Sequence, residues 1–457
     1  MLLGNVFHAF VHGSPISVMF QGTLERVFDP AKIDQLFEEH AVRQYTRQLA
    51  FSQCVQLMSD VVFKTSPSVN AWVEDHLDEL GVTRTAVYDK LQHVELPTAE
   101  ALVKYSAQTM RSAMKQLKFE KSALLPGYCL RILDGTHLAG TEHRPKVTRG
   151  YRAAALPGQV LAFYNPQSDL IEEVICCEDA HAQERSLTEQ ILSCVKPGDC
   201  IIDDRNFCTT RLLFGIHNCK AHFVTRQHGS TLNNTLIDKR KPAGKDAEGR
   251  QLYRQEMSCT NPASEESLIL RRITIELQKP TSNGHQELHL LTNLPEEISD
   301  IVIADLYRDR WTIEAAFQRL KKDLRTEIDT LAYPKAALFG CCVAMMAYNV
   351  VSMVKSTIKA AHGTEWVTEK LSTYYLTLEI SRVARGMEIA IPAKAWKIFG
   401  KMTDVEYVST MIELAKKMNL RKYTKHKRGV KKPPPKKLSG KNIKHVSTAK
   451  LLANNTK

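Results

Sequence analysis

Residues 127–136 have the sequence GYCLRILDGT, an apolar run that ends at an aspartate and a glycine. Runs of this length and composition, bounded by glycine, are typical of buried β-strands. Two more apolar runs follow, GQVLAFYN at 158–165 and DLIEEVICC at 169–177, and the turn sequence NPQS separates them. The stretch therefore predicts three consecutive strands, the first of which ends at Asp134.

Helices and strands alternate after this point. HAQERSLTEQILSCV (181–195) predicts a helix, CIID (200–203) a strand, TTRLLFGIHN (209–218) a second helix and AHFVTR (221–226) a fifth strand. The order βββαβαβ is that of the ribonuclease H-like fold, with Asp134 ending the first strand and Asp204 directly after the fourth. We therefore predict an α/β protein with a ribonuclease H-like core, a mixed five-stranded sheet with helices.

A β-rich insertion is expected to interrupt this core at residues 229–285. The segment holds a polar loop, KRKPAGKDAEGRQ, followed by the strand-like runs QLYRQEMS and ESLILRRITIEL. LHLLTNL at 288–294 then returns to a core-like strand, and helical periodicity resumes beyond residue 297. The regions before residue 126 and after residue 358 are also helical in pattern.

Residues 72–94, WVEDHLDELGVTRTAVYDKLQHV, predict two short helices around a tight turn. Gly81 tolerates the positive φ of such a turn, and Thr83 is a suitable cap for the second helix. A helix-turn-helix would present Arg84, Thr85, Tyr88 and Lys90 to a DNA major groove. Its core side would consist of Val73, Leu77, Leu80, Val82, Val87 and Leu91. An ordinary αα-hairpin explains the pattern equally well.

LYRDRWTIEAAFQRLKKDLR, residues 306–325, places polar side chains where a helix normally carries apolar ones. Tyr307, Arg310, Glu314 and Lys321 follow a spacing that gathers side chains on one helical face. An apolar stripe lies beside them, formed by Ile313, Ala316, Phe317, Leu320 and Leu324. The polar row therefore predicts a functional surface next to a core-facing stripe.

Asp134, Asp204 and Glu314 form a candidate metal site. Carboxylate oxygens are the ligands that Mg²⁺ prefers, and a pair of such ions can activate an attacking hydroxyl and steady a leaving oxygen in phosphoryl transfer. Each acid alone has an ordinary structural explanation, and the box IIDDRNF offers both Asp203 and Asp204. Strand alternation separates these two only loosely.

The four-residue signature of Tyr307, Arg310, Glu314 and Lys321 resembles that of bacterial transposases of the insertion-sequence-four family. These are Asp-Asp-Glu enzymes that include the Tn-five transposase, and the resemblance covers roughly residues 130–350. In that family an arginine follows the second acid, which points to Asp204 before Arg205. The family also carries a β-rich insertion between the second acid and the glutamate.

The resemblance implies a cut-and-paste DNA transposase that cleaves transposon ends and joins them to target DNA, with a hairpin as one route. It implies Asp134, Asp204 and Glu314 as catalytic and metal-binding residues for two Mg²⁺ ions per site, with Mn²⁺ as a substitute. The implied partners are double-stranded DNA at inverted repeats, target DNA and a second copy of the chain, without a membrane. The implied location is the bacterial cytoplasm, at the nucleoid.

DNA contacts are expected from the remaining signature residues. Arg310 and Lys321 suit phosphate oxygens, Tyr307 offers a hydroxyl donor, and Arg205 adjoins the second acid. Relatives with a hairpin step stack a base on an insertion tryptophan, whereas this chain has tryptophans only at positions 72, 311, 366 and 396. Tyr253 is the one aromatic residue of the insertion, so either it stacks the base or the hairpin is handled otherwise. His137 either positions a nucleotide or is an ordinary loop histidine.

The charge of the chain is concentrated at its C-terminus. The net charge is +12, and no acidic residue follows Glu413. Fifteen basic residues lie in this stretch: Lys416, Lys417, Arg421, Lys422, Lys425, Lys427, Arg428, Lys431, Lys432, Lys436, Lys437, Lys441, Lys444, Lys450 and Lys457. We expect a disordered tail over 416–457 that contacts nucleic-acid phosphates or keeps the protein soluble.

Three further classes are disfavoured by composition. Eleven scattered cysteines without a CxxC pair argue against a zinc module or a disulfide scaffold and favour a reducing compartment. The N-terminus lacks the basic region of a signal peptide. The apolar run at 336–354 is expected to be a buried core helix, because it carries small residues and Asn349, and not a membrane span.

The predicted organisation has six parts: a helical DNA-binding region at 1–125, catalytic parts at 126–228 and 286–358, the insertion at 229–285, a helical region for dimerisation at 359–415 and the tail at 416–457. Two alternatives to a transposase remain at this point. One is a non-catalytic, transposase-derived DNA-binding regulator. The other is a structure-specific DNA nuclease of the same fold.

Overall fold

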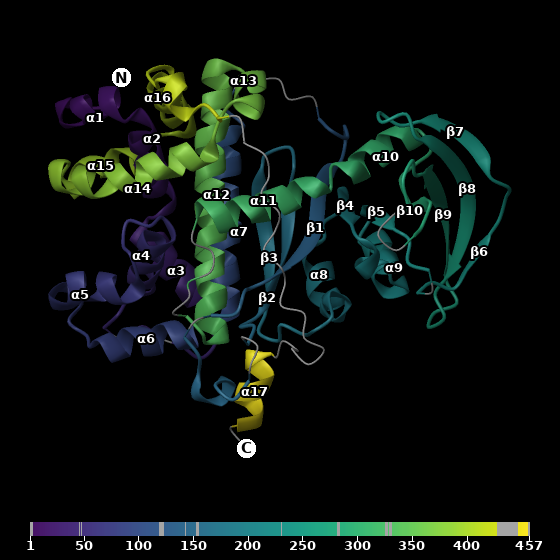
Figure 1. Ribbon diagram of the computed structural model, residues 1–457, viewed down its shortest axis with the longest axis horizontal. Coiled ribbons are helices and arrows are strands. Elements are labelled where there is room, and N and C mark those ends of the chain that lie inside the picture. Colours follow the sequence, from purple (N-terminus) through teal and green to yellow (C-terminus); the bar gives the residue numbers. More distant parts are fainter. Residues whose placement is uncertain are drawn as a thin grey trace.

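A single large sheet runs through the molecule. The computed structural model describes residues 3–455 apart from 45, 47, 118–122, 142, 152–154, 230, 281–283, 325–327, 329–330 and 427–446. In this part of the chain, ten strands form one sheet with helices on both faces (Figure 1). The N- and C-terminal helices gather beside one end of the sheet, and the insertion strands form the other end.

The strands are β1 Cys129–His137, β2 Gln159–Asn165, β3 Leu170–Cys177, β4 Asp199–Asp203, β5 His222–Arg226, β6 Asn234–Leu236, β7 Lys241–Lys245, β8 Gln251–Thr260, β9 Ser267–Glu276 and β10 Glu287–Thr292. The α-helices are α1 His8–Gly13, α2 Pro15–Val27, α3 Pro30–His40, α4 Phe51–Val62, α5 Val69–Leu80, α6 Arg84–His93, α7 Leu96–Met114, α8 Thr188–Cys194, α9 Thr210–Asn218, α10 Asp300–Arg308, α11 Trp311–Asp323, α12 Pro334–His362, α13 Thr364–Glu369, α14 Thr373–Ala390, α15 Ala393–Lys401, α16 Asp404–Lys416 and α17 Thr448–Asn455. Short 3₁₀ turns are η1 Asn5–Phe7, η2 Lys146–Thr148, η3 Glu184–Leu187, η4 Arg205–Phe207 and η5 Leu420–Tyr423.

The ribonuclease H-like core predicted from the sequence is confirmed. The sheet order is β3-β2-β1-β4-β5-β10-β9-β8-β6, with β7 paired to β8. Strands β1, β2 and β3 are antiparallel neighbours, whereas β4 is parallel to both β1 and β5. Ile132 of β1 and Ile202 of β4 are register partners in a parallel pair. The residues that follow them therefore lie next to each other at the carboxyl edge of the sheet.

The insertion continues the sheet of the core. Strand β10 pairs antiparallel with β5 on one side and with β9 on the other, and β9 pairs with β8. Strands β6 to β9 therefore extend the same hydrogen-bonded ladder beyond β5. The segment LHLLTNL forms β10, a core strand, as its apolar composition predicted. This strand also joins the core strand β5 to the insertion strand β9.

The two faces of the sheet belong to separate apolar cores. Ile132 and Ile202 lie in a core with the N-terminal helices, α10, α11 and α12, while Leu133 and Ile201 lie in a second core with α8 and α9. This division follows from the alternation of side chains along a strand. It assigns even-numbered positions at the end of β1 to the face covered by α11.

Helix α12 lies in the middle of the helical layer and contacts α2, α4, α6, α7 and α16. It is long and apolar enough to span a membrane by length and composition, yet 94% of its most apolar window is buried inside the protein. Within this core, the Asn349 side chain accepts from the backbone of Ile171 at 2.9 Å and donates to Ser106 at 2.9 Å. The apolar run at 336–354 is thus part of a buried core helix.

The N-terminal and C-terminal helices pack on each other. Helices α14, α15 and α16 all contact α2, and the rings of Phe7 and Trp396 meet edge to face with centroids 4.9 Å apart. Much of the region 359–415, which the sequence suggested for dimerisation, is therefore covered by residues of the same chain. Its large exposed apolar side chains include Tyr374, Ile389 and Val405.

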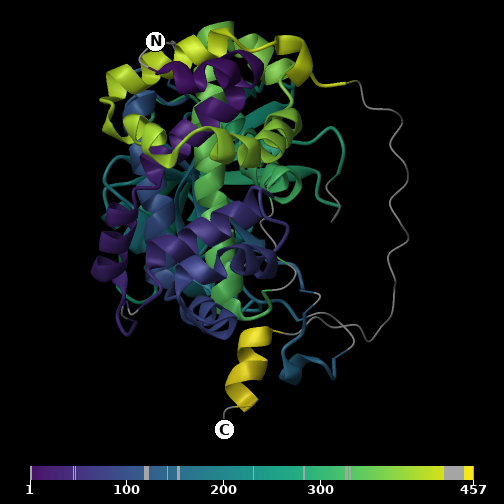
Figure 2. The ribbon, with the colours of Figure 1, turned by 90° about the vertical axis from the view of Figure 1, so that its left-hand side faces the viewer.

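The prediction of a disordered tail from residue 416 is wrong for two segments. Residues 420–423 form a 3₁₀ turn, and Thr448–Asn455 form α17. Helix α17, drawn in yellow beside the C-terminus in Figure 2, contacts η2. Lys450 of this helix forms an ion pair of 2.8 Å with Asp179. The lysines and prolines of this region predict disorder, but Leu451 and Leu452 give its end a short apolar segment that forms a helix. Residues 427–446 lie outside the described part of the chain.

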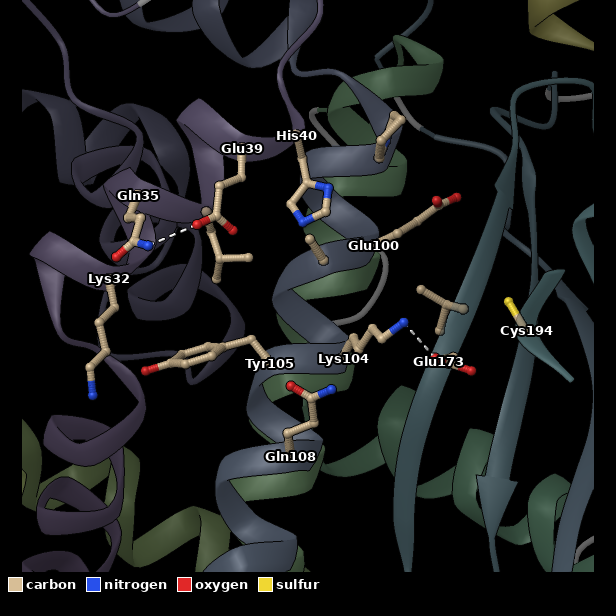
Figure 3. Close-up of a pocket in the computed structure, with 14 residues that line it drawn as sticks. Lys32, Gln35, Glu39, His40, Glu100, Lys104, Tyr105, Gln108, Glu173 and Cys194 are labelled. Carbon is tan, nitrogen blue, oxygen red and sulfur yellow. Dashed lines mark hydrogen bonds and ion pairs between the residues drawn. The ribbon is translucent and has the colours of Figure 1, made fainter. Parts of the chain in front are cut away.

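A cavity of about 590 Å³ lies between α3, α7 and β3 (Figure 3). Lys32, His40, Glu100 and Lys104 are among its lining residues. Burial raises the pKa of Glu100 to about 7, although the backbone N–H of Cys176 donates to its carboxylate at 2.7 Å and opposes this shift. The protonated form of Glu100 is therefore favoured by folding.

This gives a prediction about stability and pH. A glutamate with a raised pKa binds a proton more tightly in the folded state than in the unfolded state. The stability that this proton contributes is fully present below pH 4.5 and is lost as the pH rises to about 7. Glu100→Gln keeps the hydrogen-bond acceptor and removes this pH dependence. Above pH 7 its free energy of unfolding should exceed that of the wild type by up to about 3 kcal/mol, and near pH 4.5 this difference should disappear. Urea unfolding between pH 4.5 and 8 measures this. The exposed Glu39→Gln in the same cavity should leave the pH dependence unchanged, and equal slopes for both variants would contradict the prediction.

Candidate active site

Two acids come together where β1 and β4 end. Asp134 lies near the end of β1, and Asp204 directly follows β4, whose last residue is Asp203. Since Ile132 and Ile202 are register partners in a parallel pair, residues 134 and 204 occupy neighbouring positions two residues further on. The strand pairing thus explains why acids separated by a long stretch of sequence become neighbours.

Arg310 links the first acid to the third. Its guanidinium lies 3.2 Å from an Asp134 oxygen and 3.5 Å from an oxygen of Glu314. The Arg310 side chain is only 8% exposed, compared with 34% for Glu314. One buried cation therefore holds a carboxylate of the sheet and a carboxylate of α11 on either side of itself.

The expectation of one continuous helix face for the signature is wrong. Tyr307 belongs to α10, and α11 begins at Trp311, with Arg310 as its N-cap. The chain turns at residues 309–310 through i→i+3 backbone hydrogen bonds, which tighten it relative to an α-helix. Figure 1 shows α10 and α11 following one another nearly end to end. This local tightening brings Arg310 to face Asp134.

The charges at this site are densely packed. Burial raises the pKa of Asp134 to about 6, Arg310 opposes this shift, and the nearby carboxylates of Glu184 and Glu314 add to it. Burial also opposes the charge of Arg310, but its acidic neighbours together raise the pKa of that group. A single arginine is therefore surrounded by more negative charge than it can balance.

Asp203 and Asp204 have different environments. Asp203 is fully buried, and burial raises the pKa of its carboxyl well above the ordinary value. It follows Ile202 and so lies on the sheet face of Ile201, whose core includes α8 and α9. Asp204 is partly exposed, and one of its oxygens, Oδ1, is buried without a hydrogen-bond partner among the described residues. Both oxygens of Asp203 are likewise buried without a hydrogen-bond partner among the described residues, so the two acids differ in the sheet face that they occupy, and Asp204 is the one on the side of Asp134.

The donor set suits a hard divalent cation. Asp134, Asp204 and Glu314 offer carboxylate oxygens, and a buried oxygen without a partner, such as Asp204 Oδ1, is what a cation would satisfy. Among the described residues, no three histidine, cysteine, aspartate or glutamate side chains are already closed into a metal-binding cluster. In the structure the positive charge between Asp134 and Glu314 belongs to Arg310.

The other signature residues have distinct places. Tyr307 is 7% exposed, and burial raises the pKa of its hydroxyl, with Asp204 as a further cause. Lys321 is exposed near the end of α11, and Arg205 is partly exposed in η4 beside Asp204. The structure therefore brings Tyr307 and Arg310 to the acids. Arg205 adjoins Asp204 in the sequence, and Lys321 lies two turns beyond Glu314 along the helix.

A buried network anchors α11 to the sheet. Asp169, in the turn between β2 and β3, accepts from both terminal nitrogens of Arg319 at 3.3 and 3.4 Å and forms an ion pair with Lys355 of α12. The hydroxyls of Tyr164 and Tyr348 also donate to Asp169. Burial alone would raise the pKa of Asp169, but the two cations hold it well below its usual range. Because Arg319 and Glu314 share α11, this network fixes the position of Glu314.

The predicted two-helix segment at 72–94 forms as expected in its backbone. Gly81 ends α5 with φ +62°, and Thr83 caps α6 by accepting from the N–H of Ala86. The prediction that Leu77 faces the core is wrong, since it is 36% exposed; α5 packs on α4 and α6 at the edge of the helical layer, so its apolar stripe is not covered along its whole length.

The two basic residues proposed for a major groove are engaged within the chain. Arg84 forms an ion pair with Glu74, although its side chain remains 52% exposed. The Lys90 nitrogen lies 4.5 Å from the centre of the Phe37 ring. Neither residue belongs to the cluster around Asp134.

Tyr253 lies away from the acids. It pairs with Thr274 and not with the apolar Ile273 and Ile275 that face α10, so it belongs to the opposite face of the sheet. Its ring is covered by the guanidinium of Arg240 at 5.0 Å. The structure therefore does not bring Tyr253 together with Asp134.

Two side chains near the acids were missed from the sequence. Glu184 begins η3, and Asn206 donates to its carboxylate at 3.3 Å. Trp311 is 62% exposed, with the guanidinium of Arg310 5.7 Å from its ring. The position of Trp311 directly after a signature residue was a usable signal. Glu184 carried none, because an acid in the first turn of a predicted helix is ordinary. His137, at the exposed end of β1, contributes to the electrostatics of Glu184.

Comparison with known proteins finds a match for the middle of the chain. Residues 125–350, just under half of the chain, match a family model described as "Transposase DDE domain". No curated protein sequence matches the chain. Among solved structures, the chain is similar to one titled "Cryo-EM structure of piggyBac transposase synaptic complex with hairpin DNA". That similarity has a TM-score of 0.39 and 7% sequence identity over 85% of this chain and 84% of that chain.

Proposed function

We propose that this chain, a DDE-type transposase whose residues 125–350 form the DDE domain, cuts DNA at transposon ends and joins the freed ends to target DNA. The proposal adds Asp134, Asp204 and Glu314 as the three acids of that domain. The observation that carries it is the convergence of Asp134 and Glu314 on Arg310, beside the unpartnered oxygen of Asp204.

The residues of the site have separate roles in this proposal. Asp134, Asp204 and Glu314 would hold divalent cations, for which we propose two Mg²⁺ ions with Mn²⁺ as a substitute. When bound, such ions lower the pKa of an attacking water or hydroxyl and stabilise the leaving oxygen. Arg310 holds Asp134 and Glu314 on either side of its guanidinium, and Arg205 and Lys321 would contact phosphates of the DNA end.

The finer identity is a relative of the insertion-sequence-four family, acting as a homodimer on double-stranded inverted repeats in a bacterial cytoplasm. The four-residue signature ending at Lys321 supports this assignment. A hairpin intermediate would need an aromatic platform for an unpaired base. The exposed indole of Trp311, next to Arg310, could serve as this platform. Tyr253 lies on β8, several strands away from β1 and Asp134, and is too distant for this role.

Cleavage of a labelled DNA end tests the proposal. The substrate carries a candidate inverted repeat taken from the DNA that flanks the coding sequence, and the full-length protein is incubated with Mg²⁺, with Mn²⁺ or with EDTA. We expect cleavage at the repeat boundary with either ion and none with EDTA, because the acids alone cannot activate the nucleophile. Restored Mg²⁺ should restore the activity.

A scrambled end distinguishes the rival functions. A transposase should leave the scrambled duplex uncut, whereas a structure-specific nuclease would cut branched DNA of either sequence. A DNA-binding regulator would bind the repeat without cutting it under any ion. Cleavage that persists in EDTA would contradict the metal-dependent mechanism.

A further inference from the structure

Two buried cysteines meet where the sheet packs against the central helix. Cys176 lies near the end of β3 and Cys342 lies in α12, and their sulfur atoms are 3.4 Å apart. Both are free thiols; Cys176 is 9% exposed and Cys342 is fully buried. The sulfurs of a disulfide lie about 2.0 Å apart, so these two need to approach by only about 1.4 Å to bond. A small rotation of the side chains is enough for this.

The packing of β3 on α12 keeps the two sulfurs together. Asn349 lies two helical turns after Cys342, and its side chain accepts from the Ile171 backbone N–H and donates to the Ile171 carbonyl, both at 2.9 Å. Ile171 and Cys176 belong to the same strand. The polar contact therefore fixes the position of the helix along the strand, and the sulfur contact lies inside the same interface.

A carboxylate contacts the more exposed of the two cysteines. Glu100 of α7 accepts from the backbone N–H of Cys176 at 2.7 Å, and the Cys176 thiol is a second hydrogen-bond partner of this carboxylate. The hydrogen bond to Cys342, followed by burial, raises the pKa of the Cys176 thiol well above its ordinary value. The thiol therefore needs an adjacent base to lose its proton, and Glu100 is in the position of that base.

The cavity of about 590 Å³ gives access to this carboxylate. Glu100 and Val174 are among its lining residues, and in Figure 3 the Glu100 side chain extends from α7 toward the sheet. Val174 and Cys176 are two residues apart and therefore lie on the same face of β3. Small solutes in the cavity thus reach the group that contacts the Cys176 thiol.

We propose that Cys176 and Cys342 are a redox-active pair that a peroxide converts into a disulfide, with Glu100 as the group that takes and returns the proton. Glu100 takes the thiol proton of Cys176, and the thiolate sulfur attacks one oxygen of hydrogen peroxide. The O–O bond breaks, and the departing hydroxide recovers the proton from Glu100 and leaves as water.

The second thiol completes the reaction. The Cys342 sulfur attacks the oxidised Cys176 sulfur, the S–O bond breaks, and the hydroxide leaves as water with the Cys342 proton. Two thiols are oxidised to one disulfide while one hydrogen peroxide is reduced to two waters. A thiol reductant reverses the change by exchange.

The disulfide would join two elements that are 166 residues apart in the sequence. A cross-link over so long a loop restricts the unfolded chain and stabilises the folded one. We therefore expect the oxidised protein to unfold at a temperature several degrees above that of the reduced protein, and a thiol reductant to remove this difference.

Peptide mapping of the full-length protein tests the proposal. The folded protein is treated with hydrogen peroxide at pH 8, the remaining thiols are alkylated in denaturant, and the chain is digested without reductant. Mass spectrometry should find the peptides of Cys176 and Cys342 joined, with two hydrogens fewer than their sum, and a thiol reductant should separate them. The same treatment of the unfolded chain should not favour this pair.

Neighbouring cysteines provide matched controls, because Cys177 and Cys341 fall on the same peptides. The Cys177 thiol donates to the carbonyl of Asp179 at 3.5 Å, on the other face of β3. Cys177→Ala and Cys341→Ala should keep the cross-link, whereas Cys176→Ala and Cys342→Ala should each lose it. Thermal unfolding of the reduced variants shows which are folded, and either member of the pair serves if the other variant is not.

Glu100→Gln tests the proton transfer. Without the base, the cross-link should form on the order of 10²-fold more slowly at pH 8, whereas the exposed Glu39→Gln in the same cavity should react at the wild-type rate. Equal rates for both variants would overturn the role of Glu100.

Two results would overturn the pair itself: no joined peptide from the folded wild type, or a joined peptide that persists in Cys176→Ala and Cys342→Ala. None of these measurements uses DNA or a metal ion, so their outcome is independent of the proposed function.

Discussion

Asp204→Asn protein is expected to bind a labelled transposon end as the wild type does and to cut it on the order of 10³-fold more slowly or worse. The amide keeps the size of the side chain but cannot supply the charged oxygen that a divalent cation requires. Asp204 Oδ1 is buried and has no hydrogen-bond partner among the described residues, so the substitution breaks no hydrogen bond of this oxygen. Asp134→Asn and Glu314→Gln should lose activity to a similar extent.

The neighbouring Asp203 provides the control for this experiment. Asp203 is fully buried on the sheet face opposite Asp134, and burial raises the pKa of its carboxyl well above its ordinary value. Asp203→Asn should therefore leave cleavage within a few-fold of wild type. Rates of end cleavage under single-turnover conditions, together with an end-binding titration, make the comparison. Full cleavage by Asp204→Asn with loss in Asp203→Asn would reassign the second acid.

Asp169→Asn is expected to lower the free energy of unfolding by about 3–5 kcal/mol, because it leaves the buried Lys355 and the partly buried Arg319 without a counter-charge. Asparagine tolerates the left-handed backbone at this position, where φ is +59°, so the turn itself should survive. The two tyrosine hydroxyls that donate to Asp169 would also lose a charged acceptor. Urea unfolding monitored by circular dichroism measures the change.

The same substitution should also slow end cleavage, since Arg319 ties α11 to the sheet and Glu314 lies on α11. A surface pair supplies the comparison: Glu413 and Lys416 are each at least half exposed, and Glu413→Gln should change the free energy of unfolding by less than about 1 kcal/mol. An equal and small effect of both substitutions would show that Asp169 is not a structural anchor.

The catalytic core was predictable from the sequence because its strands are buried on both faces. Such strands appear as short apolar runs, and the run ending at Asp134 and the run before Asp204 could be recognised without any contact information. The apolar stripe of α11 was equally clear, and its members Ile313, Phe317 and Leu320 are all buried. Local periodicity was enough for these features.

What the sequence could not give depends on contacts between distant segments. The contact of Glu184 with Gly135 forms only because the segment between β3 and α8 packs against β1. Neither residue is unusual in its local sequence. The break between α10 and α11 involves no glycine or proline, so no local signal marked it. Asp169 was hidden in the turn after NPQS, where an aspartate is common, yet it is the centre of a buried network.

The sharing of one sheet by core and insertion has a mechanical consequence. Strand β5 lies between β4, which leads into Asp204, and β10, through which the insertion strands are joined. A ladder of hydrogen bonds links each strand to the next from β8 to β4. The insertion is therefore expected to move together with the core strands and not about a hinge. It is held at a set distance and angle from the acids. Displacing it would require the ladder to shear.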